Sequence, residues 1–341
     1  MTRKKKFEHR LFSDKDGKRF ATPENVAKYR ANRLKCSTIA DISCGIGGQT
    51  IYFAEECEKV FAIEIDPKKI EYARKNCRQL GIDNVEFICA DALSPEAIES
   101  LPRLDVVFSD PARPPSEKRR DINSLQPSIP EVMDAYRDKT SNFAFEAPPQ
   151  LTSERIPFDC EKEYLSLDGK MNRLDLYFGD LKKCEISAIA LPSGARIESD
   201  ADSPSIRMVS EPALYAYEPE ESVERAGLLG ELAEKVKTQA QDICVFPVDK
   251  KRTFLTSMEK IDHRLFKNRY KVLNTPAFDI ALINNYLKEN GFGTVLLRAS
   301  VDPKEYWDIR NRLEKRLRGD RKAHLFIKGQ TAILCETLQT Y

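Results

Sequence analysis

Zinc-binding residues are scarce in this sequence. It has only 3 histidines in 341 residues, and its 9 cysteines are scattered without a C-x-x-C pair. Structural zinc sites usually take their ligands from such closely spaced pairs. We therefore expect no metal site. Several cysteines lie within apolar runs, which favours small core residues in a reducing compartment over disulfides.

Membrane and export signals are also lacking. No apolar run approaches the roughly 20 residues that a membrane-spanning helix requires. The basic run Arg3-Lys4-Lys5-Lys6 leads into a mostly polar stretch and not into the apolar segment of a signal peptide. These two absences predict a soluble, cytoplasmic protein without membrane partners.

A large net charge is missing as well, because 55 Lys and Arg residues nearly balance 54 Asp and Glu residues. The balance conceals an asymmetry. Residues 251–341 hold 18 basic and 10 acidic side chains, a net charge of +8, while the rest of the chain carries −7. A basic end suggests a polyanionic substrate that is contacted mainly there. An ordinary solvated surface explains the same charges equally well.

The most informative stretch that is present runs from residue 41 to residue 66. An apolar run predicts a short strand that ends at Asp41, and three glycines between residues 45 and 48 then predict a tight turn. A helix over 49–57 and a second strand over 60–64 follow. Glu64 therefore ends a strand about twenty residues after the glycines. A carboxylate at this spacing suits a ribose diol.

Three interpretations of this turn compete. It could be an ordinary strand-to-helix turn, or it could bind a dinucleotide, whose fingerprint requires G-x-G-x-x-G and a phosphate at the helix N-terminus. Here Ser43 stands where the first glycine would be, and Asp41 would repel a pyrophosphate. The same carboxylate would attract an ammonium or a sulfonium group, and S-adenosylmethionine carries both.

Residues 22–146 resemble the class I S-adenosylmethionine-dependent methyltransferases. Five segments in the right order carry this resemblance: Phe20-Ala21-Thr22-Pro23-Glu24, similar to the lead-in of trimethylguanosine-synthase-type RNA methyltransferases; Asp41 to Thr50, apart from Ser43; Glu64; Asp91, after a strand over 85–89; and Ser109-Asp110-Pro111-Ala112-Arg113, after a strand over 105–108. Each acid alone could simply end a strand and cap a turn.

The resemblance implies a site for S-adenosylmethionine at the carboxyl ends of the strands. Its expected residues are Asp41, Ser43, Cys44, Gly45, Gly47, Gln49, Thr50, Glu64, Ile65, Asp91, Ala92 and Asp110. For Cys44 we expect the backbone to matter more than the thiol.

The resemblance also implies a catalytic loop formed by Asp110, Pro111, Ala112 and Arg113. The family pattern for base-amino methylation is Asp or Asn, Pro, Pro and an aromatic residue, so Ala112 and Arg113 both depart from it. Arg113 could stack on a purine, donate to guanine or to phosphate, or merely pair with Glu117. Because a ring nitrogen needs no base to remove a proton, we prefer guanine N7 as the target and keep N2 as possible.

The order of predicted elements indicates an α/β fold, a Rossmann-like methyltransferase core with a smaller C-terminal α/β domain. We expect a basic lead-in over 1–21, the methyltransferase domain over 22–250 and a domain over 251–341 that resembles a THUMP-like RNA-binding module. We also expect helices over 223–240, 276–289 and 303–318. The expected RNA contacts are Arg113, Lys118, Arg119, Arg120, Arg310, Arg312, Arg316 and Arg318.

Three functions remain open at this point. The first is an RNA guanine methyltransferase that acts on tRNA, whose target base lies in a loop or is flipped out of a helix. The second is a methyltransferase that uses the same cofactor on a small molecule or a protein. The third is a non-catalytic RNA-binding protein with a vestigial cofactor pocket. The oligomeric state is not readable from the sequence.

Overall fold

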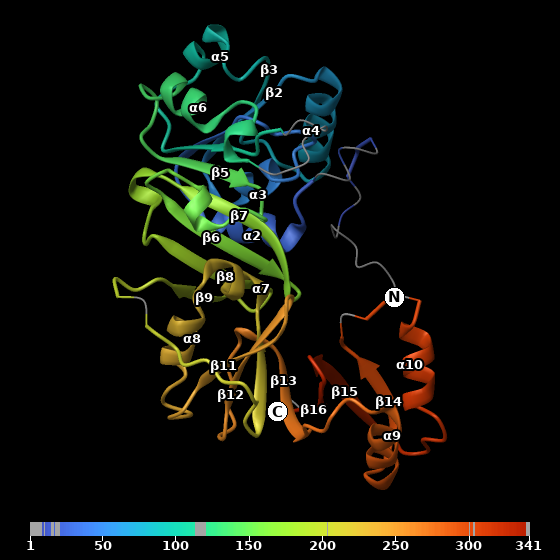
Figure 1. Cartoon of the computed structure of the whole chain (residues 1–341). Helices are drawn as coiled ribbons and strands as arrows, with labels where there is room; N and C mark the ends of the chain where they lie inside the picture. Colours follow the sequence, from blue (N-terminus) through green and yellow to red (C-terminus); the bar gives the residue numbers. More distant parts are fainter. Residues whose placement is uncertain are drawn as a thin grey trace. The chain divides into compact units, whose positions relative to one another are not determined.

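The computed structural model describes most of the chain and forms two compact units, residues 1–198 and 199–341. The residues described are 9, 11–14, 17, 21–112, 121–202, 204–299, 301–302 and 304–338. Figure 1 colours the first unit from blue to green and the second from yellow to red. Among the described helices, none has the length and apolar character needed to cross a membrane.

The first unit is built on one mixed sheet. Its strands are β1 (Thr38–Asp41), β2 (Lys59–Glu64), β3 (Val85–Cys89), β4 (Val106–Ser109), β5 (Phe143–Ala147), β6 (Glu161–Leu167), β7 (Lys170–Tyr177), β8 (Ile186–Leu191) and β9 (Ala195–Glu198). Their order in the sheet is β3-β2-β1-β4-β5-β7-β6-β8-β9. The first five are parallel, and β7 joins β5 in the antiparallel sense. This confirms the Rossmann-like core.

In sequence, the helices of the first unit lie before β1 and between successive parallel strands. They are α2 (Glu24–Arg33), α3 (Thr50–Glu56), α4 (Pro67–Gln79), α5 (Pro95–Glu99) and α6 (Ile129–Ala135). The core beneath α2 and α3 contains Ile39, Phe53, Val60 and Phe108, all buried. Chain order reverses direction across β1 and β4, and ligands of such sheets bind at the carboxyl ends of the strands at that point.

The antiparallel edge of the sheet begins with the hairpin of β6 and β7. Asp168 and Gly169 both have positive φ, 52° and 80°, as a two-residue hairpin turn requires. Beyond this hairpin, β8 pairs with β6 and β9 pairs with β8. β9 lies in a stretch rich in Ser, Pro and acidic residues, which gives no strand signal in the sequence.

The second unit has a seven-stranded sheet of its own. Its strands are β10 (Tyr215–Pro219), β11 (Cys244–Asp249), β12 (Arg252–Ser257), β13 (Phe266–Asn274), β14 (Phe292–Leu297), β15 (Arg321–Lys328) and β16 (Thr331–Thr337), in the order β11-β12-β10-β13-β16-β15-β14. Because β10 and β11 belong to this sheet, the structure divides the chain after residue 198, whereas the sequence placed the division after residue 250.

The helices of the second unit are shorter than predicted. They are α7 (Glu221–Ala226), α8 (Leu229–Lys235), α9 (Ile280–Glu289) and α10 (Tyr306–Leu313). The predicted single helix over 223–240 is broken by Gly227, whose φ of 75° is left-handed. Leu287, Val295, Leu313 and Leu325 are buried in the core that joins α9 and α10 to β14 and β15.

Candidate active site

Four predicted site carboxylates lie at the same edge of the first sheet. Asp41 ends β1, Glu64 ends β2, Asp91 follows β3 and Asp110 follows β4. These strands are parallel neighbours in the order β3-β2-β1-β4. Their carboxyl ends therefore meet at one edge, as the sequence predicts.

Two glycines in the turn after β1 have different surroundings. Gly45 and Gly47 both have positive φ, 54° and 82°. A Cβ atom added to Gly47 would lie 3.1 Å from the Cβ of Ala73, so this glycine lets α4 pack closely against the turn. A Cβ atom on Gly45 would meet nothing within 4 Å. The backbone at Gly45 therefore borders open space, where a ligand can approach.

Glu64 is held in place by backbone amides. Its Oε2 accepts from the Gly45 N–H at 3.0 Å, and its Oε1 accepts from the Asp66 N–H at 2.9 Å. Each carboxylate oxygen keeps a second lone pair for a ligand hydroxyl. The next side chain, Ile65, is apolar yet 67% exposed. An oriented acid beside an exposed apolar side chain is the arrangement that a ribose and an adenine ring require.

Asp41 lies deeper than the other acids and is only 1% exposed. It accepts from the Thr50 hydroxyl at 2.7 Å and from the Ser43 N–H at 3.4 Å. Burial raises the pKa of Asp41 to about 6, although these hydrogen bonds oppose the shift. In this structure the Asp41 carboxylate holds the turn together from below. Cys44 is buried too, and its N–H donates to the Ile63 carbonyl at 3.0 Å.

Ser43 links the glycine turn to the loop that follows β4. Its hydroxyl oxygen accepts from the Asp110 N–H at 2.6 Å. Ser43 is the residue that departs from the family motif, and glycine could not make this contact. Farther along the loop, Ala112 and Gln126 exchange two backbone hydrogen bonds of 2.9 Å, which closes the loop at its base. Arg113, Lys118, Arg119 and Arg120 lie between these two points, outside the described residues.

The end of β3 offers a polar group at the surface. Asp91 is exposed, and its Oδ1 accepts from the Leu93 N–H at 2.9 Å. The Ala92 carbonyl accepts from the Tyr136 hydroxyl at 2.7 Å. Burial, with a smaller contribution from the Asp91 charge, raises the pKa of Tyr136 above its usual value, so this hydroxyl stays protonated and donates. Tyr136 therefore fixes the backbone that presents Asp91.

Sequence reasoning missed a buried arginine behind the site. Arg30 on α2 is 0% exposed. Its guanidinium donates to both oxygens of Asp175, to Glu146 at 2.9 Å and to Gln49 at 3.1 Å. It also lies 4.9 Å from the ring centroid of Phe108. Arg30 thus joins α2 to the glycine turn and to the ends of β4 and β5.

Glu146 could have been recognised from the sequence, because it is one more acid near the carboxyl end of a central strand. Its other oxygen pairs with the Nε of Arg173 at 2.7 Å. Burial alone would raise the pKa of Glu146, but Arg173 and Arg30 outweigh it and lower the pKa. Glu146 is therefore an anion that is fully compensated by two arginines. No sequence pattern identified Arg30 as its partner.

The four described arginines expected to contact RNA lie in the second unit on and after α10. Arg310 pairs with Glu314 at 3.2 Å, and Arg312 faces Asp308 at 3.5 Å. Arg316 and Arg318 are exposed. With the division after residue 198, the second unit carries 23 basic and 21 acidic residues, so the surplus is small. The positive charge is instead concentrated locally, around α10.

Comparison with known proteins agrees with this geometry. The sequence model of the RNA cap guanine-N2 methyltransferase family matches residues 36–135. An uncharacterised S-adenosylmethionine-dependent methyltransferase from Mycobacterium tuberculosis is 28% identical over 321 residues, which are 91% of this chain and 82% of the relative. A solved structure from Porphyromonas gingivalis, assigned to the methyltransferases, has a TM-score of 0.76 at 15% identity and covers 96% of this chain and 84% of its own. The chain is an S-adenosylmethionine-dependent methyltransferase.

A shorter match concerns RNA. An uncharacterised RNA methyltransferase from Clostridium tetani is 37% identical over 82 residues, which are 24% of this methyltransferase and 18% of the relative. Because the chain is an enzyme, the third function considered from the sequence, a non-catalytic RNA-binding protein, has no support.

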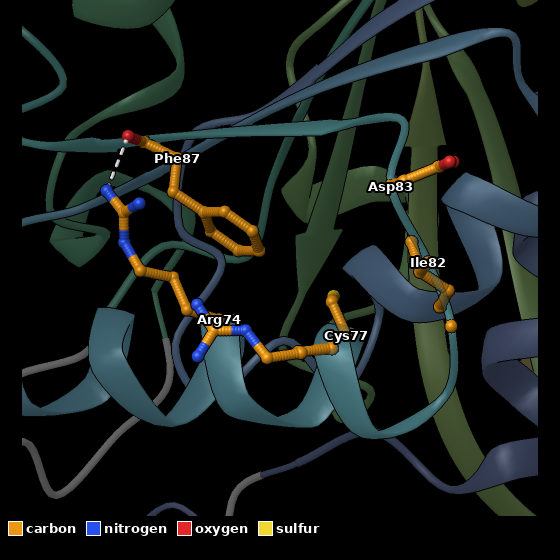
Figure 2. Close-up of a pocket in the computed structure, with 7 residues that line it drawn as sticks. Arg74, Cys77, Ile82, Asp83 and Phe87 are labelled. Carbon is orange, nitrogen blue, oxygen red and sulfur yellow. Dashed lines mark hydrogen bonds between the residues drawn. The ribbon is translucent and has the colours of Figure 1, made fainter.

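A hollow of about 370 Å³ lies elsewhere on the methyltransferase, where α4 ends and β3 begins. Figure 2 shows Arg74 of α4 beside Phe87, with its guanidinium donating to the Phe87 carbonyl at 2.9 Å. Cys77 and Ile82 also line the hollow. None of the predicted site residues does, so this hollow is separate from the active site.

Proposed function

We propose that this class I methyltransferase transfers a methyl group to guanine in RNA, with tRNA as the substrate. The cofactor is S-adenosylmethionine. The observation that carries this assignment is the row of four acids at the ends of β3, β2, β1 and β4, beside an open glycine turn. It supplies the polar and apolar contacts that an adenosine with a charged sulfur needs.

Each part of the site has a separate task toward the cofactor. Glu64, oriented by two amides, accepts from the ribose hydroxyls, and Asp91 accepts from the adenine amino group while Ile65 covers the ring. Asp41 acts through the turn that it holds. The sulfonium makes its methyl carbon electrophilic. The protein therefore needs mainly to align the nucleophile and exclude water.

The side of the site that faces the base is formed by Asp110, Pro111 and Ala112. The Asp110 backbone is tied to Ser43, so the catalytic loop and the glycine turn are held in register. The Asp110 carboxylate and the Pro111 carbonyl are then placed to accept from a guanine. Arg113 belongs to the same loop by sequence, and we assign to it stacking on the base or donation to guanine O6.

RNA is supported by two independent features. The matching family model is described as an RNA cap guanine-N2 methyltransferase, and the relative from Clostridium tetani is named an RNA methyltransferase. The second feature is the exposed basic segment on and after α10, which suits phosphates. We propose that residues 199–341, a THUMP-like unit, supply this RNA contact.

Two nitrogens of guanine are candidates. The departures at Ala112 and Arg113 from the base-amino pattern favour N7, because N7 already carries a lone pair. The description of the matching family favours N2. Both products have the same added mass in RNA, but they separate as nucleosides after digestion.

All 9 cysteines are free, which fits action in the reducing cytoplasm.

The substrate is tested with cofactor that carries a labelled methyl group. Separate pools of tRNA, rRNA, protein and small metabolites are incubated with the enzyme, and the labelled product is identified by nucleoside mass spectrometry. We expect label on a guanosine of tRNA. Label on protein or a small molecule, with none on RNA, would contradict the proposal.

Asp110→Ala should reduce methyl transfer at least about 100-fold, because the substrate loses its aligning acceptor. RNA retention and cofactor affinity should change less than about 3-fold. The matched control is Asp121→Ala, at the exposed far end of the same loop, which should leave turnover within about 3-fold. Undiminished turnover in Asp110→Ala would remove Asp110 from this role.

A further inference from the structure

The second unit exposes the single tryptophan of the chain. Trp307 is the second residue of α10 and is 61% exposed. The helix does not need it for packing, because Tyr306 and Ile309 pack against the core and Leu313 is fully buried in it. A large indole ring left in water is an uncommon feature that suits a partner with a flat, partly apolar face.

The ring of Trp307 is supported on α10. The Tyr306 ring meets it edge to face, with 5.4 Å between centroids. The Arg310 guanidinium lies 5.5 Å from the indole centroid and is itself held by Glu314 at 3.2 Å. Two neighbours therefore restrict the indole, which reduces the ordering entropy that a ligand would otherwise have to offset.

Positive charge is concentrated in the segment that follows this ring in the sequence. Residues 310–322 hold 7 basic and 2 acidic side chains, a net charge of +5. Arg312, Lys315, Arg316 and Arg318 are exposed. Arg312 pairs with the exposed Asp308 at 3.5 Å, and such surface pairs are weak and easily displaced.

We propose that Trp307 is a stacking platform for an unpaired base of the RNA, with the basic residues of 310–322 binding the adjacent phosphates. This inference rests on the proposed function. A flat π-surface flanked by exposed cations complements a single-stranded nucleic acid, whose bases and phosphates alternate. A duplex hides its base faces and would gain only the phosphate contacts.

The single tryptophan makes the test direct, because all indole emission comes from Trp307. The full chain is titrated with a 12-nucleotide single-stranded RNA and with the same sequence as a duplex. We expect quenching of the emission and protection from acrylamide with the single strand, and little of either with the duplex. Binding of the single strand, seen by anisotropy of a labelled RNA, with unchanged indole emission would overturn the inference.

Variants separate stacking from general surface effects. Trp307→Ala should weaken single-strand binding about 10-fold or more, whereas Trp307→Phe should stay within about 3-fold of the wild type, because it keeps an aromatic face. Leu282→Ala on α9 is the matched control, since Leu282 is apolar and 60% exposed. An equal loss in Leu282→Ala and Trp307→Ala, or no loss in either, would contradict stacking.

The outcomes for this site and for the enzyme are distinguishable. If the wild-type protein binds and methylates RNA while the emission of Trp307 does not change, the proposed function stands and the stacking platform is refuted. A protein that neither retains nor methylates any RNA refutes the proposed function itself. Sedimentation that shows a dimer lost in Trp307→Ala, with RNA affinity unchanged, would identify the indole as a contact between copies and also refute the platform.

Discussion

At the scale of single residues, the glycine turn combines a half-buried acid with a fully buried one. Glu64 is oriented by two amides and is half-buried, whereas Asp41 is 1% exposed beneath the turn. Sequence spacing predicted both positions, because strand ends and glycines are strong local signals. It did not predict their difference in depth, which depends on how α3 and its Thr50 close over β1.

Asp41 should make cofactor binding depend on pH. Burial raises its pKa to about 6, so the carboxyl is neutral below that pH and anionic above it. A cationic cofactor is attracted only by the anion. The affinity for S-adenosylmethionine should therefore rise as the pH increases from about 5 to about 7 and then level off.

Asp41→Asn is the control for this pH dependence, because it keeps the shape and removes the titration. Calorimetry across the same pH range should show a flat profile for that variant. The raised pKa also means that the wild type loses folding stability as the pH rises from about 4 to about 6, since the folded state holds the proton more tightly. A wild-type affinity that is flat or falls with pH would contradict this account of Asp41.

At the scale of elements, Arg30 couples α2 to the strand ends. Its guanidinium neutralises Asp175 on β7 and Glu146 on β5, and all three groups are buried. Arg30→Met would leave two acids in the interior, and of these Glu146 would still pair with Arg173. Breaking a buried pair from one side typically costs about 3–5 kcal/mol. We expect a loss of that size in the free energy of unfolding, measured in urea.

The matched control for Arg30 is Lys28→Met on the same helix. Lys28 is 48% exposed and pairs with Glu24 four residues earlier, so its loss should cost less than about 1 kcal/mol. Arg30→Met should also regain stability at low pH, because protonation neutralises the two stranded acids. Equal stabilities of the two variants would show that the buried network contributes little.

Element prediction succeeded where periodicity was clear and failed where it was interrupted. The strands expected over 60–64, 85–89 and 105–108 match β2, β3 and β4, whereas the short helix α5 between β3 and β4 was not predicted. The helix over 223–240 was wrong because Gly227 takes a left-handed φ and starts a new helix. The partners of Arg30 come from β5, β7 and the glycine turn, and no local pattern reports contacts between residues so far apart in sequence.

At the scale of the whole molecule, the division of the chain follows the sheets and not the composition. Strands β10 and β11 pair within the second sheet, so residues 199–250 fold with the basic tail that the sequence set apart. The unit as a whole is then nearly neutral, and the basic residues near Trp307 stand out as a local surface. Charge summed over a predicted domain was therefore a weaker guide than charge along one short segment, residues 310–322.

The central claim, that the strand-end acids hold S-adenosylmethionine, is tested most directly by calorimetry with the cofactor and with its demethylated product. Both should bind the wild type, and Glu64→Ala should weaken them about 10-fold or more, because two charge-assisted hydrogen bonds to the ribose are lost. Glu86→Ala, an exposed acid on β3, should bind as the wild type does. No heat from well-folded wild-type protein, or equal affinity in Glu64→Ala, would contradict the account.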